Sequence, residues 1–286
     1  MLSEDLPWYT PITPNPKQYT YALRELGKNE QLNLAILHLI AHEYENNKSV
    51  LLCAESFGAK SNRIGDTFIR SASFSNLMPV DIVLNYRTAR VDHLISNWKQ
   101  DRDEKGAPSN FHKWLCSNKY VDNLQDSKGL DVFGRAQLFL DEGWRVILVD
   151  LGGVERDNLD VSHVIACNVL RVPCSENGDI QGYSKSKQQS KDKLGKQNQR
   201  EGDTNITLYQ YNGLDTILRQ RDCLYAASFK EAKSRGQMHF LHQHTLLTSC
   251  DDKYHVDSPV LQKSLLSNEG IMQLLRDQVG GCQLFS

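Results

Sequence analysis

The sequence lacks the features of several large classes of protein. It contains no apolar run of about 18 residues, the length that a membrane-spanning helix requires. Its first residues, MLSEDLPWYTPITPNPKQ, have neither the basic nor the apolar segment of a secretory signal. No charge of one sign dominates, since 33 Lys and Arg stand against 35 Asp and Glu. We therefore expect a soluble, intracellular chain without a membrane span, and no nucleic acid partner held by a global basic field.

Closely spaced cysteine pairs are also lacking. None of the seven cysteines belongs to a C-x-x-C pair, which argues against a zinc ribbon. An odd number of cysteines in a chain of 286 residues argues against a disulfide framework, so buried free thiols are the expectation. The histidines between 239 and 244 fit no closed zinc-site spacing, and no metal site is predicted.

What is present is the composition of a globular protein with a few unusual segments. With 40% hydrophobic and 24% charged residues, the chain can build a sizeable core. Residues 1–16 carry four prolines, which remove backbone donors and predict an extended arm. Residues 175–204 are rich in lysine and nearly free of apolar side chains, which predicts a disordered basic insertion, either a solvated loop or a mobile lid over an anionic ligand. We expect residues 17–286 to form a single α/β domain.

Short apolar runs alternate with amphipathic segments, and this order predicts an α/β fold with a parallel sheet flanked by helices. The expected strands cover residues 48–54, 81–85, 144–150 and 206–211. The expected helices include residues 88–98, 130–142, 159–172, 214–235 and 258–279. Asp150 ends one of these strands, where a helix-capping or loop role is expected rather than a catalytic one.

The most informative stretch is Asp81 to Gln100, DIVLNYRTARVDHLISNWKQ. Its strand delivers basic side chains to the carboxyl end, where open α/β sheets bind ligands. An arginine in that place can hold a phosphate or sulfate through two parallel hydrogen bonds. Helical spacing leaves Arg90 off an apolar stripe that comprises Val91, Leu94, Ile95 and Trp98. The stretch predicts a local anion site, and an amphipathic helix with solvated charges is the plainer alternative.

This stretch, together with VLLCAESFG before it, resembles the sulfotransferases that use 3′-phosphoadenosine 5′-phosphosulfate (PAPS). In many members of that family a strand ends in an arginine, a serine follows about eight residues later, and both bind the 3′-phosphate of the nucleotide. The resemblance implies that Arg87 and Ser96 bind an anionic adenine nucleotide. The spacing here is nine residues, so Arg90 is an alternative to Arg87. The resemblance also implies a three-layer, P-loop-like architecture with PAPS as the donor.

The implied activity is transfer of a sulfuryl group from PAPS to a hydroxyl or amine of a small-molecule or carbohydrate acceptor. Family members take the acceptor proton with His or Glu, and the implied candidates are Glu55, His93 and His112. The phosphosulfate loop of the family is not found in the sequence, and the loop Glu55–Ser61 lacks the first glycine of a P-loop.

The missing loop leaves alternatives open. The chain is either shortened at its N-terminus, in which case a Golgi enzyme fits, or it is a non-catalytic nucleotide-binding or interaction protein that keeps the fold. A third alternative is a thiol or metal hydrolase that uses Cys167, four residues after His163, or the histidines at 239–244.

Overall fold

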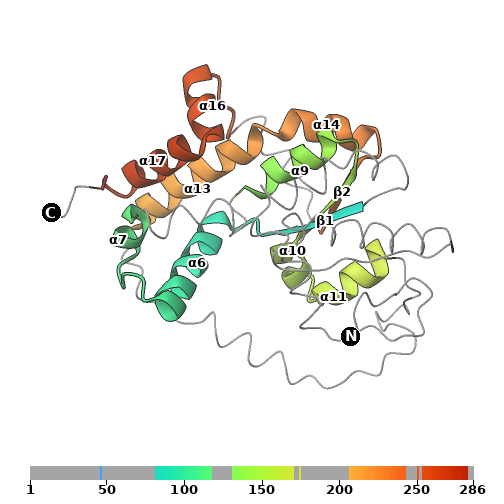
Figure 1. Ribbon diagram of the computed structural model, residues 1–286, viewed down its shortest axis with the longest axis horizontal. Helices are drawn as coiled ribbons and strands as arrows, with labels where there is room; N and C mark the ends of the chain where they lie inside the picture. Colours follow the sequence, from blue (N-terminus) through green and yellow to red (C-terminus); the bar gives the residue numbers. More distant parts are fainter. Residues whose placement is uncertain are drawn as a thin grey trace, which may run out of the picture. The chain divides into compact units, whose positions relative to one another are not determined.

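The computed structural model describes a defined part of the chain (Figure 1), namely Asn46, Cys174, Cys250 and residues 81–117, 131–170, 206–242 and 253–282. The predicted arm at 1–16, the strand at 48–54 and the insertion at 175–204 lie outside the described residues. The chain divides into two compact units, Met1–Ile82 with Asn123–Val146, and Val83–Asp122 with Ile147–Ser286. Among the described helices, none has the length and apolar character needed to cross a bilayer.

The described strands are β1 (Asp81–Tyr86), β2 (Arg145–Asp150) and β3 (Met238–Leu241). They form a parallel sheet in the order β1-β2-β3. The helices around it confirm the predicted α/β class. Every residue of β2 from Val146 to Asp150 is buried, as expected for a parallel strand covered on both faces. The predicted strands at 81–85 and 144–150 are therefore confirmed, each within one residue.

Helices make up most of the remaining described residues. They are α6 (Arg90–Lys105), α7 (Phe111–Cys116), α9 (Val132–Asp141), α10 (Leu151–Arg156), α11 (Val161–Val164), the π-helix η1 (Ile165–Val169), α13 (Leu208–Cys223), α14 (Ala226–Ser234), α16 (Pro259–Leu266) and α17 (Asn268–Gln278).

In the first unit, α9 leads into the start of β2. Its buried residues are Val132, Phe133, Arg135, Ala136 and Leu140. Gly143 adopts a left-handed conformation, with φ of 81°, that ends the helical segment before the strand. Arg145 then pairs with Asp81 through two hydrogen bonds, of which the one from Nε measures 2.6 Å. This pair joins the first residues of the two strands.

In the second unit, one hydrophobic cluster lies between the sheet and the helices after β2. Ile147 and Val149 alternate along β2 and so face the same side of the sheet. Val154 of α10 and Val164 of α11 pack against them. Four partly buried residues complete the cluster, Val83, Val161, Val169 and Leu241. This packing fixes α10, which begins directly after β2.

The other helices of the second unit gather around α13, which contacts α6, α14, α16 and α17. The predicted apolar stripe of α6 is confirmed for Val91, Leu94 and Trp98, which are fully buried. The plainer alternative, that the charged residues of this helix are merely solvated, is wrong for Arg90. Its side chain is only 2% exposed because it forms an ion pair with Asp222 of α13.

The predicted strand at 206–211 is wrong, because α13 begins at Leu208. Thr207 and Gln210 form a capping box, in which each side chain bonds the backbone N–H of the other residue. This local signal overrides the period-two alternation. The predicted helix at 214–235 is two helices, α13 and α14, and that at 258–279 is α16 and α17, which meet at Ser267.

The expectation of free thiols is wrong for six of the seven cysteines. Disulfides join Cys116 to Cys282, Cys167 to Cys174, and Cys223 to Cys250. The partners lie 166, 7 and 27 residues apart, so no C-x-x-C motif in the sequence predicts these disulfides. Cys53 lies outside the described residues. Disulfides are typical of oxidising compartments, which argues against the expected intracellular location.

A hydrogen bond between α13 and α6 gives a prediction about alkaline pH. The Tyr211 hydroxyl donates to Asp92 Oδ1 over 3.0 Å. Burial, and then this bond, raise the pKa of Tyr211 to about 12. Because the folded pKa lies above the unfolded value of about 10, the contribution of Tyr211 to stability is present below pH 10 and is lost as pH rises toward 12. The difference in phenolate absorbance between wild type and Tyr211→Phe should show one group titrating near pH 12; titration near pH 10 would contradict the assignment.

Candidate functional site

Polar residues lie at the ends of three strands, at the carboxyl edge of the sheet in the second unit. Arg87 and Thr88 follow β1, Asp150 ends the central strand β2, and His242 follows β3. Since parallel strands place their carboxyl ends on one edge, the topology brings together residues up to 155 positions apart in the sequence. We define this edge as the candidate site.

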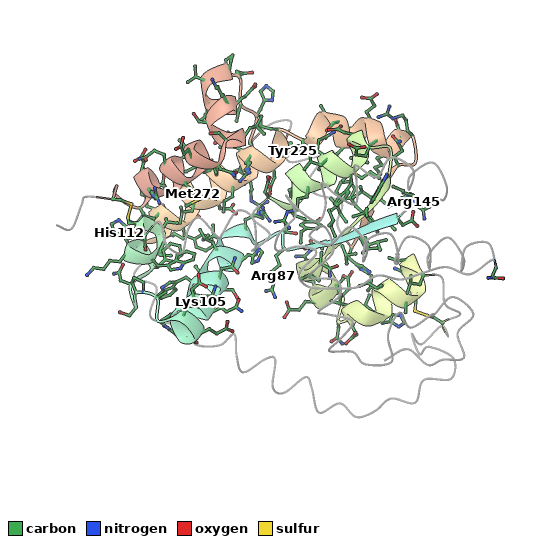
Figure 2. All side chains as sticks on the ribbon, in the orientation of Figure 1. Arg87, Lys105, His112, Arg145, Tyr225 and Met272 are labelled. Atoms are coloured by element: carbon green, nitrogen blue, oxygen red, sulfur yellow. A yellow bond between two sulfur atoms is a disulfide. The ribbon has the colours of Figure 1, made fainter. Side chains whose placement is uncertain are left out.

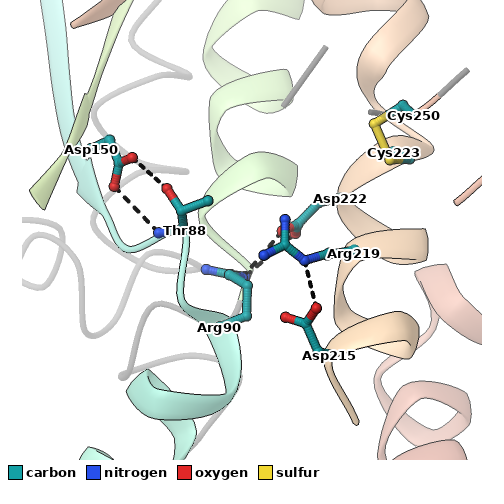
Figure 3. A network of polar contacts seen from close by, with 8 residues as sticks. All are labelled: Thr88, Arg90, Asp150, Asp215, Arg219, Asp222, Cys223 and Cys250. Carbon is teal, nitrogen blue, oxygen red and sulfur yellow. Dashed lines mark hydrogen bonds and ion pairs between the residues drawn. A yellow bond between two sulfur atoms is a disulfide. The ribbon is translucent and has the colours of Figure 1, made fainter. Parts of the chain in front are cut away.

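Asp150 organises the centre of the site (Figure 3). Its carboxylate is fully buried and accepts hydrogen bonds from the Thr88 backbone N–H at 3.3 Å and from the Thr88 hydroxyl. It also accepts from the Gly152 backbone N–H at 3.1 Å, which confirms the predicted capping role. Arg156 Nη2 lies 3.7 Å from the same carboxylate. Asp150 thus fixes the turns after β1 and β2 relative to each other.

Burial and nearby carboxylates keep the hydroxyl of Tyr86 protonated at this edge. Tyr86, the last residue of β1, is buried, and burial raises the pKa of its hydroxyl far above the usual value. The negative charges of Asp150 and Asp222 raise it further. Tyr86 therefore stays a neutral phenol, and Arg87 after β1 and Arg156 at the end of α10 supply the positive charge of the site.

His242 lies at the end of β3 in an arrangement suited to proton transfer. Its Nδ1 lies 2.7 Å from Asp157 Oδ2, and because a carboxylate only accepts, Nδ1 carries the proton. In the neutral ring Nε2 is then the unprotonated nitrogen, and no residue in the described part of the chain bonds this buried atom. A Cβ at Gly153 would lie 2.1 Å from the His242 carbonyl oxygen, so glycine permits the close approach that seats His242 beside α10.

The two candidate arginines of β1 and α6 have different surroundings. Arg90 Nε lies 3.2 Å from Asp222 Oδ2, and the pair is buried (Figure 3). Arg87 is half-buried in the turn before α6 (Figure 2), and no described residue bonds or pairs with its guanidinium. Ser96 is exposed on α6, six residues beyond Arg90, or about 9 Å along the helix axis. A ligand that contacts both Arg87 and Ser96 must therefore lie along the first two turns of α6.

Of the three proposed proton acceptors, the two described ones lie on helices and not at the ends of the strands. Glu55 lies outside the described residues, and His93 is half-buried on α6. His112 is half-buried on α7, where its Nε2 lies 3.0 Å from the Gly281 carbonyl oxygen and therefore acts as the donor. Cys167, the nucleophile of the hydrolase alternative, is bonded to Cys174 and carries no free thiol.

Sequence patterns left Thr88, Asp157 and the role of His242 unrecognised. The histidines near 240 entered only the hydrolase alternative, and the strand before His242 was not predicted because β3 is four residues long and its pattern is weak. The only sequence signal for the role of His242 was the order of elements, namely two helices, then a short apolar strand, and then the histidine. Its pairing with Asp157, 85 residues earlier, depends on the sheet order.

Comparisons of the chain with protein-family models, curated proteins and solved structures found no match. The chain's own residues therefore carry the functional argument.

Proposed function

We propose that the chain binds an anionic adenine nucleotide at the carboxyl edge of the sheet and transfers a sulfuryl group from PAPS to a hydroxyl or amine acceptor. The observation that supports this best is the contrast between the two arginines. Asp222 neutralises Arg90, whereas the charge of Arg87 has no partner among the described residues and stands where α/β sheets bind ligands. An unpaired guanidinium is suited to a bidentate contact with phosphate.

In this proposal Arg87 holds the 3′-phosphate of the nucleotide, and the exposed Ser96 hydroxyl donates a further hydrogen bond. Arg156, 67% exposed and only loosely paired with Asp150, adds positive charge at the same edge. PAPS would supply the sulfuryl group. Thr88 and Asp150 keep the turn that carries Arg87 in place. The site thus combines a fixed turn with two cationic side chains.

In this proposal His242 accepts the proton that the acceptor loses, and the acceptor has to reach its buried Nε2 on binding. As the acceptor oxygen or nitrogen bonds to sulfur, the bond from sulfur to the bridging phosphate oxygen breaks, and the acceptor proton passes to His242 Nε2. Asp157 then stabilises the imidazolium through Nδ1. Strand spacing places the ends of β1 and β3 about 10 Å apart, a distance that nucleotide and acceptor can span together.

The disulfides bear on where this reaction would occur. An oxidising lumen such as that of the Golgi suits a chain with three of them. Carbohydrate hydroxyls are then the acceptor class that we propose to test first.

Titration calorimetry with 3′-phosphoadenosine 5′-phosphate tests the nucleotide site. Arg87→Ala should weaken binding by about 1.5 to 3 kcal/mol, or about 10- to 150-fold in Kd, because a charge-assisted hydrogen bond is lost. Arg102→Ala is the matched control, since it removes the same charge from the far part of α6, where Arg102 pairs with Asp103 and lies over Trp98. The control should bind like wild type.

Equal affinities of wild type and Arg87→Ala would remove the basis of the proposal, as would the absence of binding by wild type. Transfer itself is tested with sulfur-labelled PAPS and carbohydrate, phenol and amine acceptors. Nucleotide binding that depends on Arg87, without transfer to any acceptor, would favour the non-catalytic alternative.

A further inference from the structure

We propose that His163, Cys167 and Cys174 form a redox-controlled zinc site. The site cannot bind zinc while the Cys167–Cys174 disulfide is intact, and it can bind zinc once that disulfide is reduced. One ligand atom from each residue lies within 4.8 Å of the other two. Each of the three side chains is half-buried, so solvent and metal can reach them. No other trio of His, Cys, Asp or Glu in the described part of the chain gathers in this way. The site shares no residue with the sheet edge assigned to the nucleotide.

The local backbone already places the histidine and the first cysteine as zinc ligands require. His163 lies on α11 and Cys167 four residues later in η1, so both side chains project from the same side of one helical segment. Both ring nitrogens of His163 lie 3.4 Å from Cys167 Sγ. In a tetrahedral site with Zn–S of about 2.3 Å and Zn–N of about 2.0 Å, ligand nitrogen and sulfur stand about 3.5 Å apart. The nitrogen–sulfur separation therefore already matches that of two ligands on one metal, and the His163 ring has to turn one nitrogen toward it.

The π-helical turn η1 carries Cys167. Its hydrogen bonds run from residue i+5 to residue i, as from the Leu170 N–H to the Ile165 carbonyl at 2.9 Å. The turn that holds Cys167 is therefore wider than an α-helical turn. Single π-helical turns inside helices are often found at functional sites. Cys174 returns after only seven residues, which completes a compact H-x3-C-x6-C ligand set.

The disulfide and the metal exclude each other chemically. A dithiol reductant donates two electrons and two protons, becomes a disulfide itself, and leaves two thiols in place of the Cys167–Cys174 bond. Zn²⁺ then displaces both thiol protons, and neutral His163 adds the third ligand. Two sulfurs on one zinc ion stand about 3.8 Å apart, which a bonded pair cannot do. Two thiolates balance the charge of Zn²⁺, and a fourth position remains for water or another ligand.

Cobalt(II), a spectroscopic substitute for zinc, provides the test on the full chain. The protein is reduced with an excess of dithiothreitol, freed of reductant without air, and titrated with Co²⁺. We expect thiolate-to-cobalt charge-transfer bands and the visible bands of a tetrahedral ion at one equivalent, and their loss on addition of Zn²⁺. The oxidised protein should show neither band. A reduced wild type without these bands would overturn the proposal.

Variants show whether the bands come from this site, because reduction frees the other cysteines too. Cys167→Ser/Cys174→Ser should abolish the charge-transfer bands, and His163→Ala should weaken cobalt binding at least tenfold. The matched control is Cys223→Ser/Cys250→Ser, which removes another disulfide and should keep the bands. Bands that persist in the first double variant, disappear in the control, or are unaffected by His163→Ala would overturn the assignment.

Discussion

Asp222→Ala should lower the free energy of unfolding by about 3 to 5 kcal/mol. Arg90 and Asp222 are 2% and 4% exposed, and Arg90 Nη2 adds a second contact at 3.4 Å to the 3.2 Å ion pair. Removing the carboxylate leaves a guanidinium that water cannot reach, and breaking a buried pair in this way costs about that amount. The loss is measurable as a shift of the urea unfolding midpoint at unchanged m-value.

The same helix offers a matched control for this prediction. Asp215 of α13 pairs with Arg219 over 2.7 Å, but both side chains are more than 20% exposed. Asp215→Ala should therefore cost no more than about 0.5 kcal/mol, as is usual for exposed pairs four residues apart on a helix. Equal losses for Asp215→Ala and Asp222→Ala would show that burial does not decide the strength of the Arg90 pair.

Loss of the Cys116–Cys282 disulfide should have an effect of similar size. The bond closes a loop of 166 residues, and the chain-entropy model assigns about 5 kcal/mol to such a loop. It ties the end of α7 to the residues after α17. Two other contacts hold the same junction, His112 to the Gly281 carbonyl at 3.0 Å and Arg276 Nε to the Leu115 carbonyl at 3.2 Å. We expect Cys116→Ser/Cys282→Ser to lose about 4 to 5 kcal/mol in urea unfolding.

The short disulfide is the comparison for that measurement. Its sequence separation of 7 corresponds to about 2.5 kcal/mol in the same model, so Cys167→Ser/Cys174→Ser should be distinctly more stable than Cys116→Ser/Cys282→Ser. Both double variants should be studied without reductant, so that the remaining disulfides stay intact. The reverse order of stability would mean that loop length does not set the contribution of these bonds.

Several elements were predictable because their signals are local. The apolar run of β1, the stripe of Val91, Leu94 and Trp98 on α6, and the helix-to-strand order of α9 and β2 all follow from residues within one turn or one strand of each other. The capping role of Asp150 was predictable for the same reason, since its acceptor geometry involves Gly152, two residues away. The error at 206–211 arose where two local signals competed and the capping box prevailed.

Local patterns along the chain were enough to predict the α/β class, the strand that ends before Arg87 and the helix that carries Ser96. Contacts between distant segments were needed to show that Arg90 is bound to Asp222, 132 residues away, and that Arg87 is the arginine without a partner among the described residues. The same holds for the hydrogen bonds of Thr88 with Asp150 and of His242 with Asp157, and for the disulfides between six cysteines. The reason is physical: periodicity and capping depend on neighbours along the chain, whereas ion pairs, disulfides and sheet order depend on the path that brings distant segments together.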